Sequence, residues 1–194
     1  NLVTILSDIE DKEHSVFSLE DEYNLLSNLD LEHHYELANF FKDREYYQES
    51  IKYYSLALQH IKQDHFLFPK ILDRRGTSYE RLGEWNKAEK DLKESLRILP
   101  DQPHVLNYLG YSWIDRGTNI DQALEMVMRA NELKENDGYI IDSVGWAFYV
   151  KKNYLDAERF LQKAVEILPL DPIINDHYAD ILWILNKHIQ ARYF

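Results

Sequence analysis

The chain has 194 residues, with 34 acidic and 22 basic side chains and a net charge of −12 at pH 7. That length suits one domain or a short repeat array, and an apolar share of 45% supplies a core. The charge argues against a nucleic-acid partner, whose phosphates attract Lys and Arg. The absence of Cys excludes disulfides, thiol catalysis and Cys-ligated metals, and leaves cytoplasm and periplasm equally open.

The first 30 residues predict two short helices rather than a clear repeat. Leu2, Ile5 and Ile9 lie on one face of an amphipathic helix, and Ser18 can cap a second one. We therefore expect residues 1–30 to form a helical segment, either a degenerate repeat or a cap.

From residue 31 onward, small residues recur at a fixed period. Glycines stand 34 and 35 residues apart at Gly76, Gly110 and Gly145. Alanines keep the same period at Ala88, Ala123, Ala157 and Ala191. Such a period indicates a repeat architecture. We expect each of the three glycines to let its helix approach the alanine of the partner helix, at Ala88, Ala123 and Ala157.

Each period is typical of two helices. Apolar side chains have helical spacing over residues 70–82 and 84–99, with Gly83 between the two segments. Pro103 and Pro172 match Pro at the first position of a helix, and Asp137 matches an N-cap.

These units resemble the tetratricopeptide repeat, a helix–turn–helix unit of 34 residues. Its first-helix motif has an apolar residue, then Gly, then an aromatic residue three positions later, and the matching segments are residues 75–79, 109–113 and 144–148. Departures are mild: Arg75 replaces the apolar residue, and Ala38 and Ala179 replace Gly. The resemblance implies an all-α fold, a right-handed superhelix (α-solenoid) of antiparallel helix pairs.

The predicted units follow the repeat period. They are residues 31–68 with an insertion, 69–102, 103–137, 138–171 and a partial fifth repeat at 172–194. Several segments are also similar to repeats of larger proteobacterial proteins of this family, which favours a bacterial source.

Catalytic motifs are missing from the sequence. It has no phosphate-binding loop, no nucleophile elbow and no His-Glu-x-x-His helix, so we expect neither an enzyme nor a cofactor. Asp176, His177 and Asp180 form a polar cluster, which we interpret as a helix face near a groove rather than a metal site. No apolar run approaches the roughly 18 residues of a membrane helix, so we expect no membrane insertion.

The resemblance implies that the first helix of each pair lines a concave face, the usual binding surface of a solenoid. The residues expected to face this groove are Asn107, Tyr111, Ile114, Tyr139, Asp142, Trp146, Tyr149, Asp176, Asp180 and Trp183. Aromatic residues dominate binding hot spots, and carboxylates select positive charge. We therefore predict a protein or peptide partner with apolar and basic residues. For Trp146 and Trp183, packing against the neighbouring repeat is an equally good interpretation.

A different class of function stays open, namely self-association or a structural spacer within a longer protein. The fifth unit has only about two turns of its second helix, over residues 187–194. We expect Tyr178, Leu182, Leu185 and Ile189 to lack the helix that should cover them. An uncapped repeat of this kind predicts a homodimer through the C-terminal end.

Overall fold

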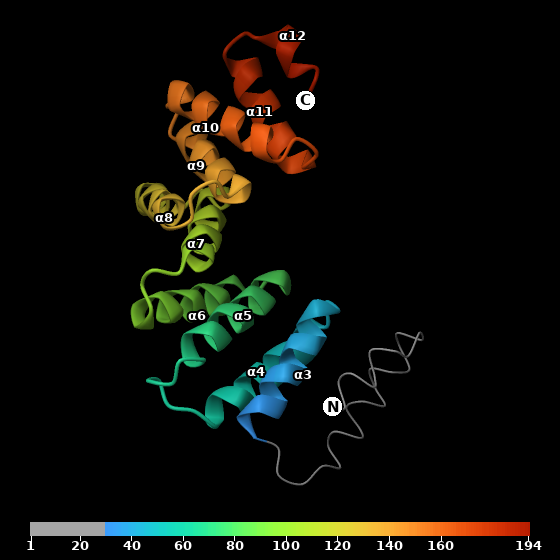
Figure 1. The fold of residues 1–194 in the computed structure, drawn as a ribbon, viewed down its shortest axis with the longest axis vertical. Coiled ribbons are helices and arrows are strands. Elements are labelled where there is room, and N and C mark those ends of the chain that lie inside the picture. Colours follow the sequence, from blue (N-terminus) through green and yellow to red (C-terminus); the bar gives the residue numbers. More distant parts are fainter. Residues whose placement is uncertain (1–29) are drawn as a thin grey trace. The chain divides into compact units, whose positions relative to one another are not determined.

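The computed structural model describes residues 30–194, and all regular structure in this range is helical (Figure 1). Ten helices follow one another there without a strand, which confirms the predicted all-α class. The helical segment predicted for residues 1–30 lies outside the described residues, apart from Asp30 itself. Within the described range, no helix has the length and apolar character needed to cross a membrane.

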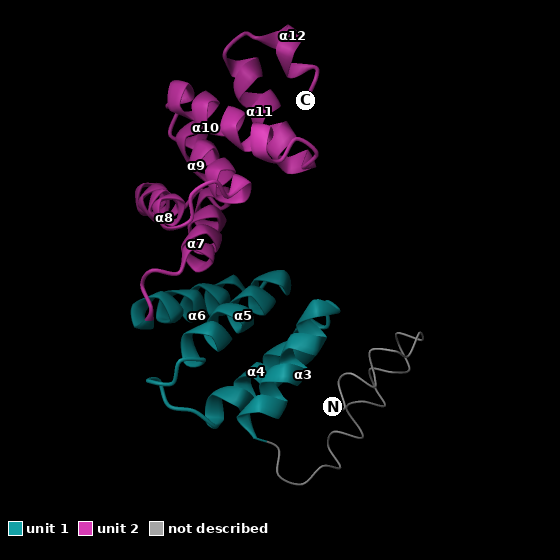
Figure 2. Ribbon diagram, in the orientation of Figure 1, with its two compact units in different colours: residues 1–98 teal, residues 99–194 magenta. Residues whose placement is uncertain are grey.

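The chain divides into two compact units, and the described part of the N-terminal unit is residues 30–98 (Figure 2). Its helices are α3 (Leu31–Asp43), α4 (Tyr47–Gln59), α5 (Phe68–Arg81) and α6 (Trp85–Ile98). Each helix packs on the next one in the chain. The α3–α4 pair is held by an aromatic core in which the rings of Phe41 and Tyr53 stack at 5.4 Å.

The C-terminal unit, residues 99–194, continues the same helix-pair arrangement. Its helices are α7 (Pro103–Asp115), α8 (Ile120–Leu133), α9 (Gly138–Val150), α10 (Tyr154–Ile167), α11 (Pro172–Ile184) and α12 (His188–Ala191). Contacts join α7 to α8, α9 to α10 and α11 to α12, and α9 also contacts both α7 and α11. The first helices of the three pairs therefore lie side by side.

The turn inside each helix pair repeats the same backbone conformation. A residue with a left-handed backbone follows each first helix, and these residues are Glu45, Gly83, Gly117, Lys152 and Asn186. After α7, the Gly117 N–H donates to the Ile114 carbonyl at 3.0 Å and the Thr118 N–H to the Trp113 carbonyl at 2.9 Å. This is a Schellman-type helix end. Glycine adopts it freely, whereas a residue with a Cβ does so at a cost.

The helix starts follow the predicted signals. Pro103 and Pro172 are the first residues of α7 and α11. The Asp137 carboxylate accepts hydrogen bonds from the N–H groups of Tyr139 and Ile140 at 3.1 and 3.3 Å. Both predictions are confirmed.

The helices approach each other closely at the three glycines, as predicted, but at Gly145 the nearest residue is not the predicted alanine. A Cβ added at Gly76 would lie 3.2 Å from the Ala88 carbonyl oxygen, and one at Gly110 would lie 3.1 Å from that of Ala123. At Gly145 the three nearest atoms belong to Leu161, the closest at 2.6 Å, rather than to Ala157. Bulkier residues at these sites would collide with the partner helix.

The C-terminal end is better covered than the sequence predicts. Tyr178 and Leu182 are buried, with 9% and 1% of their surface exposed, because the chain after α11 turns back over them. The ring of Phe194 meets that of Tyr178 edge-on at 4.9 Å. The expectation that Tyr178 and Leu182 lack cover is therefore wrong, whereas Ile189 is 76% exposed, as expected.

Candidate binding site

In each of the three helix pairs of the C-terminal unit, the first helix (α7, α9 or α11) contributes to one shared face that carries acidic but no basic side chains. We call it the α7–α9–α11 face. These helices carry four aspartates and no Lys or Arg, the aspartates being Asp115, Asp142, Asp176 and Asp180. Among the cations of the same unit, Lys151 pairs with Asp121 and Lys187 with Glu158, and Arg116, just after α7, lies 3.9 Å from Asp115. The formal charge of this face is thus negative.

A row of aromatic rings crosses the face from one helix to the next. The Trp146 ring stacks on the Tyr149 ring at 4.5 Å and on the His177 imidazole at 4.0 Å. On α7, the Tyr111 ring lies 6.5 Å from that imidazole. Trp146 and Tyr149 share a helix face because they are three residues apart. The row therefore links α7, α9 and α11 through side chains.

A buried polar pair fixes the centre of this row. The carboxylate of Asp142 lies 3.0 Å from Nδ1 of His177, with both oxygens at that distance. The two side chains are only 7% and 9% exposed. Buried polar groups need such partners because an unsatisfied one costs about 1–3 kcal/mol. The pair holds the imidazole flat against Trp146.

A pocket of about 200 Å³ opens beside the aromatic row. Its lining residues come from α7, α9 and the start of α11, namely Asn107, Tyr108, Tyr111, Tyr139, Asp142, Ser143, Asp171, Ile173 and Ile174. Asn107 contributes a side-chain Oδ1 that is buried and has no hydrogen-bond partner. None of the lining residues is Lys or Arg, and two of them, Asp142 and Asp171, are carboxylates.

The electrostatics of the face agree with its composition. Burial raises the pKa of the Asp180 carboxyl above its ordinary value, and the nearby Asp176 charge raises that pKa further. Burial also raises the pKa of the Tyr111 hydroxyl, with added effects of the Asp115 and Asp142 charges. Burial is the larger cause of both shifts, and neighbouring negative charge adds to each.

Most of the predicted groove residues lie on this face, but they differ in accessibility. Asn107, Tyr111, Tyr139 and Asp142 line the pocket, and Trp146 and Tyr149 belong to the aromatic row. Asp176 and Asp180 are exposed. Trp183 is 55% exposed and its ring meets that of His188 edge-on. Trp146 contacts the neighbouring repeat, as the alternative interpretation expected, through His177.

Ile114 is the exception among the predicted residues. It is only 2% exposed and belongs to the core, because it lies on the side of α7 that packs inward. The assignment of Ile114 to the groove is therefore wrong.

Sequence reasoning missed the role of His177 and the contribution of Ser143 and Tyr108. A signal for His177 was present, since Asn107, Asp142 and His177 are each 35 residues apart and so occupy the same position in successive repeats. Equivalent positions on adjacent first helices are natural contact partners. Within residues 30–194 no group of three or more His, Cys, Asp or Glu side chains that could hold a metal ion comes together.

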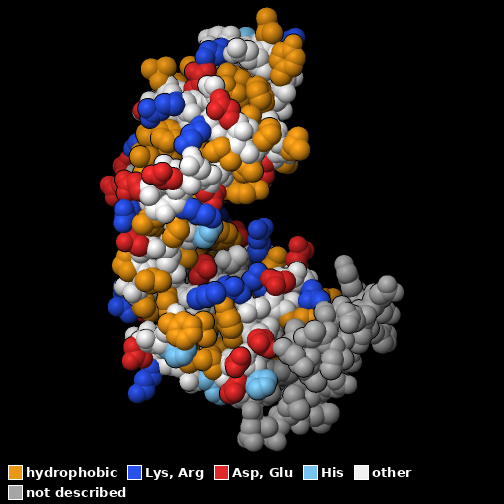
Figure 3. Space-filling model, viewed as in Figure 1, with side chains coloured by type: hydrophobic (Ala, Val, Ile, Leu, Met, Phe, Trp, Pro, Cys, Tyr) orange, Lys and Arg blue, Asp and Glu red, His pale blue; other side chains and the backbone are white. Residues whose placement is uncertain are grey.

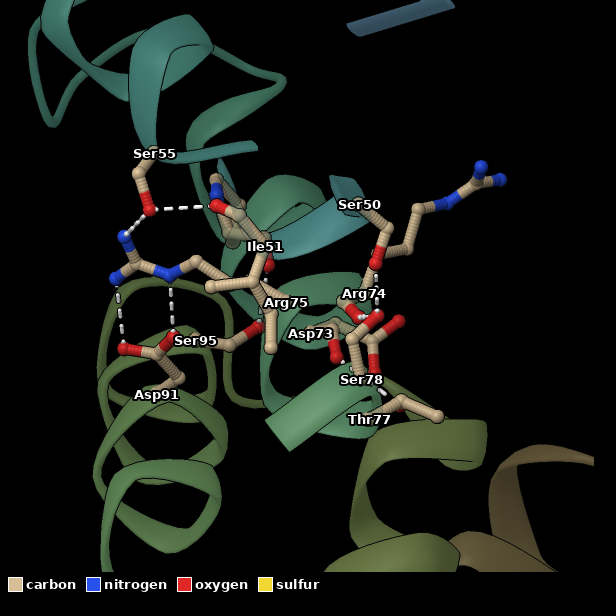
Figure 4. A network of polar contacts seen from close by, with 11 residues as sticks. Ser50, Ile51, Ser55, Asp73, Arg74, Arg75, Thr77, Ser78, Asp91 and Ser95 are labelled. Carbon is tan, nitrogen blue, oxygen red and sulfur yellow. Dashed lines mark hydrogen bonds and ion pairs between the residues drawn. The ribbon is translucent and has the colours of Figure 1, made fainter. Parts of the chain in front are cut away.

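The corresponding helices of the N-terminal unit are organised differently. The Arg75 guanidinium, shown in Figure 4, donates to both carboxylate oxygens of Asp91 at 2.7 and 3.0 Å and to Ser55 Oγ at 3.0 Å. Arg74 donates to Asn39 Oδ1, which also accepts from the Tyr54 hydroxyl at 2.7 Å. The departure from the repeat motif at Arg75 is thus explained by an internal ion pair.

Comparisons with known proteins agree with this architecture. No protein-family model matches the chain. A segment of 99 residues, 51% of the chain, is 35% identical to TPR repeat-containing protein PA4667 of Pseudomonas aeruginosa, and it spans 17% of that protein's length. Among solved structures, MamA from Desulfovibrio magneticus is similar with a TM-score of 0.73 at 17% identity, over 84% of this chain and 89% of that one.

Two further solved structures share the fold. PilF of Pseudomonas aeruginosa has a TM-score of 0.71 at 14% identity, over 84% of this chain and 72% of its own. A tetratricopeptide repeat protein from Parabacteroides merdae has a TM-score of 0.73 at 22% identity, over 99% of this chain and 75% of its own.

The helix pairs, their common turn and these similarities define an α-solenoid. The chain has the fold of tetratricopeptide-repeat proteins. Proteins of this fold are generally scaffolds for protein interaction rather than catalysts, because stacked repeats present an extended surface and no enclosed reaction site.

Proposed function

We propose that the α7–α9–α11 face binds a protein or peptide segment with apolar and basic side chains. The observation that carries the proposal is the aromatic row of Tyr111, His177, Trp146 and Tyr149 on helices with four aspartates and no Lys or Arg. Aromatic rings offer large contact areas with little loss of side-chain entropy. Carboxylates without basic neighbours on their own helices favour a basic partner.

The proposal extends over the predicted residues from Asn107 on α7 to Trp183 on α11. An extended segment that crosses these helices would meet the pocket first and the aromatic row next. The exposed carboxylates of Asp176 and Asp180 would speed its approach by electrostatic steering. Salt should therefore weaken binding, mainly by slowing association.

The test begins with random twelve-residue peptides displayed on phage and selected on the full chain. We expect enriched peptides to carry aromatic or aliphatic residues together with Lys or Arg, and to quench tryptophan fluorescence. Replacing Trp146→Ala should weaken a selected peptide at least tenfold. The matched control is Trp85→Ala in the N-terminal unit, which removes the same side chain elsewhere and should leave affinity within twofold.

Two results would contradict the proposal. One is the recovery of peptides whose affinity is unaffected by Trp146→Ala and by the double replacement Asp176→Asn with Asp180→Asn. The other is selection of acidic peptides, since these carry the wrong charge for this face.

As a second candidate function, we propose that two copies of the chain associate through the α11–α12 end. Four large apolar side chains remain exposed there: Trp183 (55%), Ile184 (43%), Ile189 (76%) and Tyr193 (82%). Hydrophobic side chains are prominent at this end in Figure 3. Association would remove this apolar area from water, which is favourable by about 25 cal/mol per Å².

Sedimentation velocity over a range of concentrations tests this second candidate. The chain should show a concentration-dependent mass, and Ile189→Glu combined with Tyr193→Lys should favour the monomer. Leu155→Glu on α10 is the control, because Leu155 is equally exposed, at 78%, but lies on another helix. A monomer at every concentration, or an equal effect of Leu155→Glu, would contradict it.

A further inference from the structure

We infer that the pocket between α7, α9 and α11 takes one arginine side chain of the bound segment. This inference rests on the proposed function and names one subsite within it. The pocket volume of about 200 Å³ is below the roughly 300–1,000 Å³ of small-molecule sites. That size suits a single side chain.

The walls of the pocket favour a cation. Three tyrosines, Tyr108, Tyr111 and Tyr139, contribute aromatic surface, and the face of an aromatic ring attracts a positive charge. Asp142 and Asp171 add carboxylates to the same lining, with no Lys or Arg among the lining residues to neutralise them. A neutral or anionic side chain would leave these charges without a counterpart.

The acceptors are distributed in a way that suits a guanidinium better than an ammonium group. They belong to lining residues from three helices: Asn107 on α7, Asp142 on α9 and Asp171, the N-cap of α11. Arginine presents five N–H donors in a planar fork and also stacks on aromatic rings, whereas the lysine ammonium is a compact point charge. One guanidinium can therefore serve acceptors on different sides.

Two of the acceptors retain capacity after folding. Asp171 uses Oδ1 to cap α11, accepting from the N–H groups of Ile173 at 3.0 Å and Ile174 at 3.1 Å, which leaves Oδ2 for a ligand. Asn107 Oδ1 is buried without a hydrogen-bond partner. An incoming donor would remove the cost of leaving this acceptor unsatisfied.

The third acceptor is held in place before any ligand arrives. His177 Nδ1 lies 3.0 Å from both oxygens of Asp142, and stacking on Trp146 fixes the imidazole. A carboxylate offers about four acceptor positions, so the His177 contact does not exhaust it. Ile173 and Ile174 supply apolar surface for the methylene stem of the ligand, as long basic side chains require.

The experiment is an NMR titration of the full chain with N-acetyl-arginine amide. We expect saturable shifts at the amides of Tyr111 and Ser143. N-acetyl-lysine amide should bind at least threefold more weakly. The matching citrulline amide, which has nearly the same shape without the charge, should bind at least tenfold more weakly.

Variants locate the site. Asp171→Asn keeps a residue that caps helices well but removes the charge, and Asn107→Leu removes the acceptor at similar size. Each should weaken the arginine probe at least fivefold. Glu125→Gln, at an exposed position on α8 and outside the pocket lining, should change it less than twofold. A urea titration of each variant shows whether the fold is kept.

Three results would overturn the arginine assignment: equal binding of the citrulline probe, equal binding of the lysine probe, or an equal loss with Glu125→Gln. The selected peptides test the proposed function separately from the arginine pocket. If these bind in a Trp146-dependent manner but tolerate Arg→Lys replacement, the pocket assignment is wrong while the binding function stands. If the arginine probe titrates the pocket but no peptide is selected, the proposed function is wrong.

Discussion

The two units use the same helix pair but differ in whether their first helices carry Lys and Arg. In the N-terminal unit, α5 carries Lys70, Arg74, Arg75 and Arg81, and the two central arginines bind side chains of the same unit. Lys and Arg side chains are visible on this unit in Figure 3. In the C-terminal unit, α7, α9 and α11 have aspartates and no Lys or Arg.

This difference separates what the repeat dictates from what it leaves open. Glycines, alanines and the left-handed turn fix how two helices pack, and they recur in both units. Positions on the outer side of the first helix are not constrained by that packing. In the N-terminal unit, Arg74 and Arg75 bind side chains of the same unit, whereas α7, α9 and α11 carry the aspartates and the aromatic row that we propose bind a partner.

The largest expected effect comes from breaking the internal ion pair of the N-terminal unit. Asp91→Ala should lower the free energy of unfolding by about 3 kcal/mol, because it leaves the Arg75 guanidinium largely buried without its counter-charge. The side chains of Arg75 and Asp91 are 18% and 9% exposed. Urea titration followed by circular dichroism measures the loss.

The double variant Arg75→Met with Asp91→Leu is the control for this prediction. It removes both charges and restores apolar contact, so most of the lost stability should return. A double variant as unstable as Asp91→Ala would show that the ion pair itself, rather than an orphaned charge, determines stability.

The second-largest expected effect is the loss of stability when a tightly packed glycine is replaced by alanine, which should differ between the two units. Gly145→Ala should destabilise by about 2 kcal/mol, since its Cβ would lie 2.6 Å from Leu161 Cγ and 3.0 Å from the Leu161 backbone nitrogen. At Gly76 the nearest atom is 3.1 Å away, and the higher helix propensity of Ala, worth about 1 kcal/mol, offsets the contact. Gly76→Ala should therefore stay within about 0.5 kcal/mol of the natural chain by thermal unfolding. Equal losses at both sites would contradict the packing comparison.

The sequence predicts more of the fold than of the candidate site. Helix starts at Pro103 and Pro172 and the cap at Asp137 follow from local chemistry, and local chemistry is visible in sequence. Ile114 was misplaced because helical spacing alone does not say how wide the buried face of α7 is. The cover of Tyr178 by Phe194 depends on the path of the chain after α11, which no periodicity encodes.

The Asp142–His177 contact shows where the limit lies. The two residues stand one repeat apart, so the period places them on adjacent helices. Whether their side chains meet depends on rotamers and on the stacking of Trp146, which only the structure supplies.

A smaller effect concerns the turn that both units share. Gly83 in the N-terminal unit and Lys152 in the C-terminal unit have left-handed backbones, with φ of +76° and +62°. Lys152→Gly should stabilise by about 0.5–1 kcal/mol because it relieves the Cβ strain. Gly83→Ala should cost about 1–2 kcal/mol for the same reason. If thermal unfolding showed the same sign for both variants, the two turns would not be equivalent.

The smallest effect tests the charge contrast by pH. In the N-terminal unit, a hydrogen bond from Arg97 lowers the pKa of the Glu94 carboxyl, whereas in the C-terminal unit burial and the Asp176 charge raise the pKa of Asp180. A raised pKa means that ionised Asp180 is less favourable in the folded state. Its contribution to stability is therefore complete below the ordinary value of 3.8 and is lost as the pH rises through the raised pKa.

Carbon-detected NMR titration of both carboxyls measures the contrast directly. Asp180 should titrate above 3.8 and Glu94 below 4.5, their ordinary values. Asp176→Asn should move the Asp180 pKa downward but keep it raised, because burial is the larger cause. Asp180→Asn should stabilise the chain at pH 7 by less than about 0.5 kcal/mol, since water screens an exposed charge, and this gain should vanish below pH 3.8. If Asp180 titrated below its ordinary value, a cation or hydrogen-bond donor would have to lie nearby, and Asp180 would not contribute uncompensated charge to the α7–α9–α11 face.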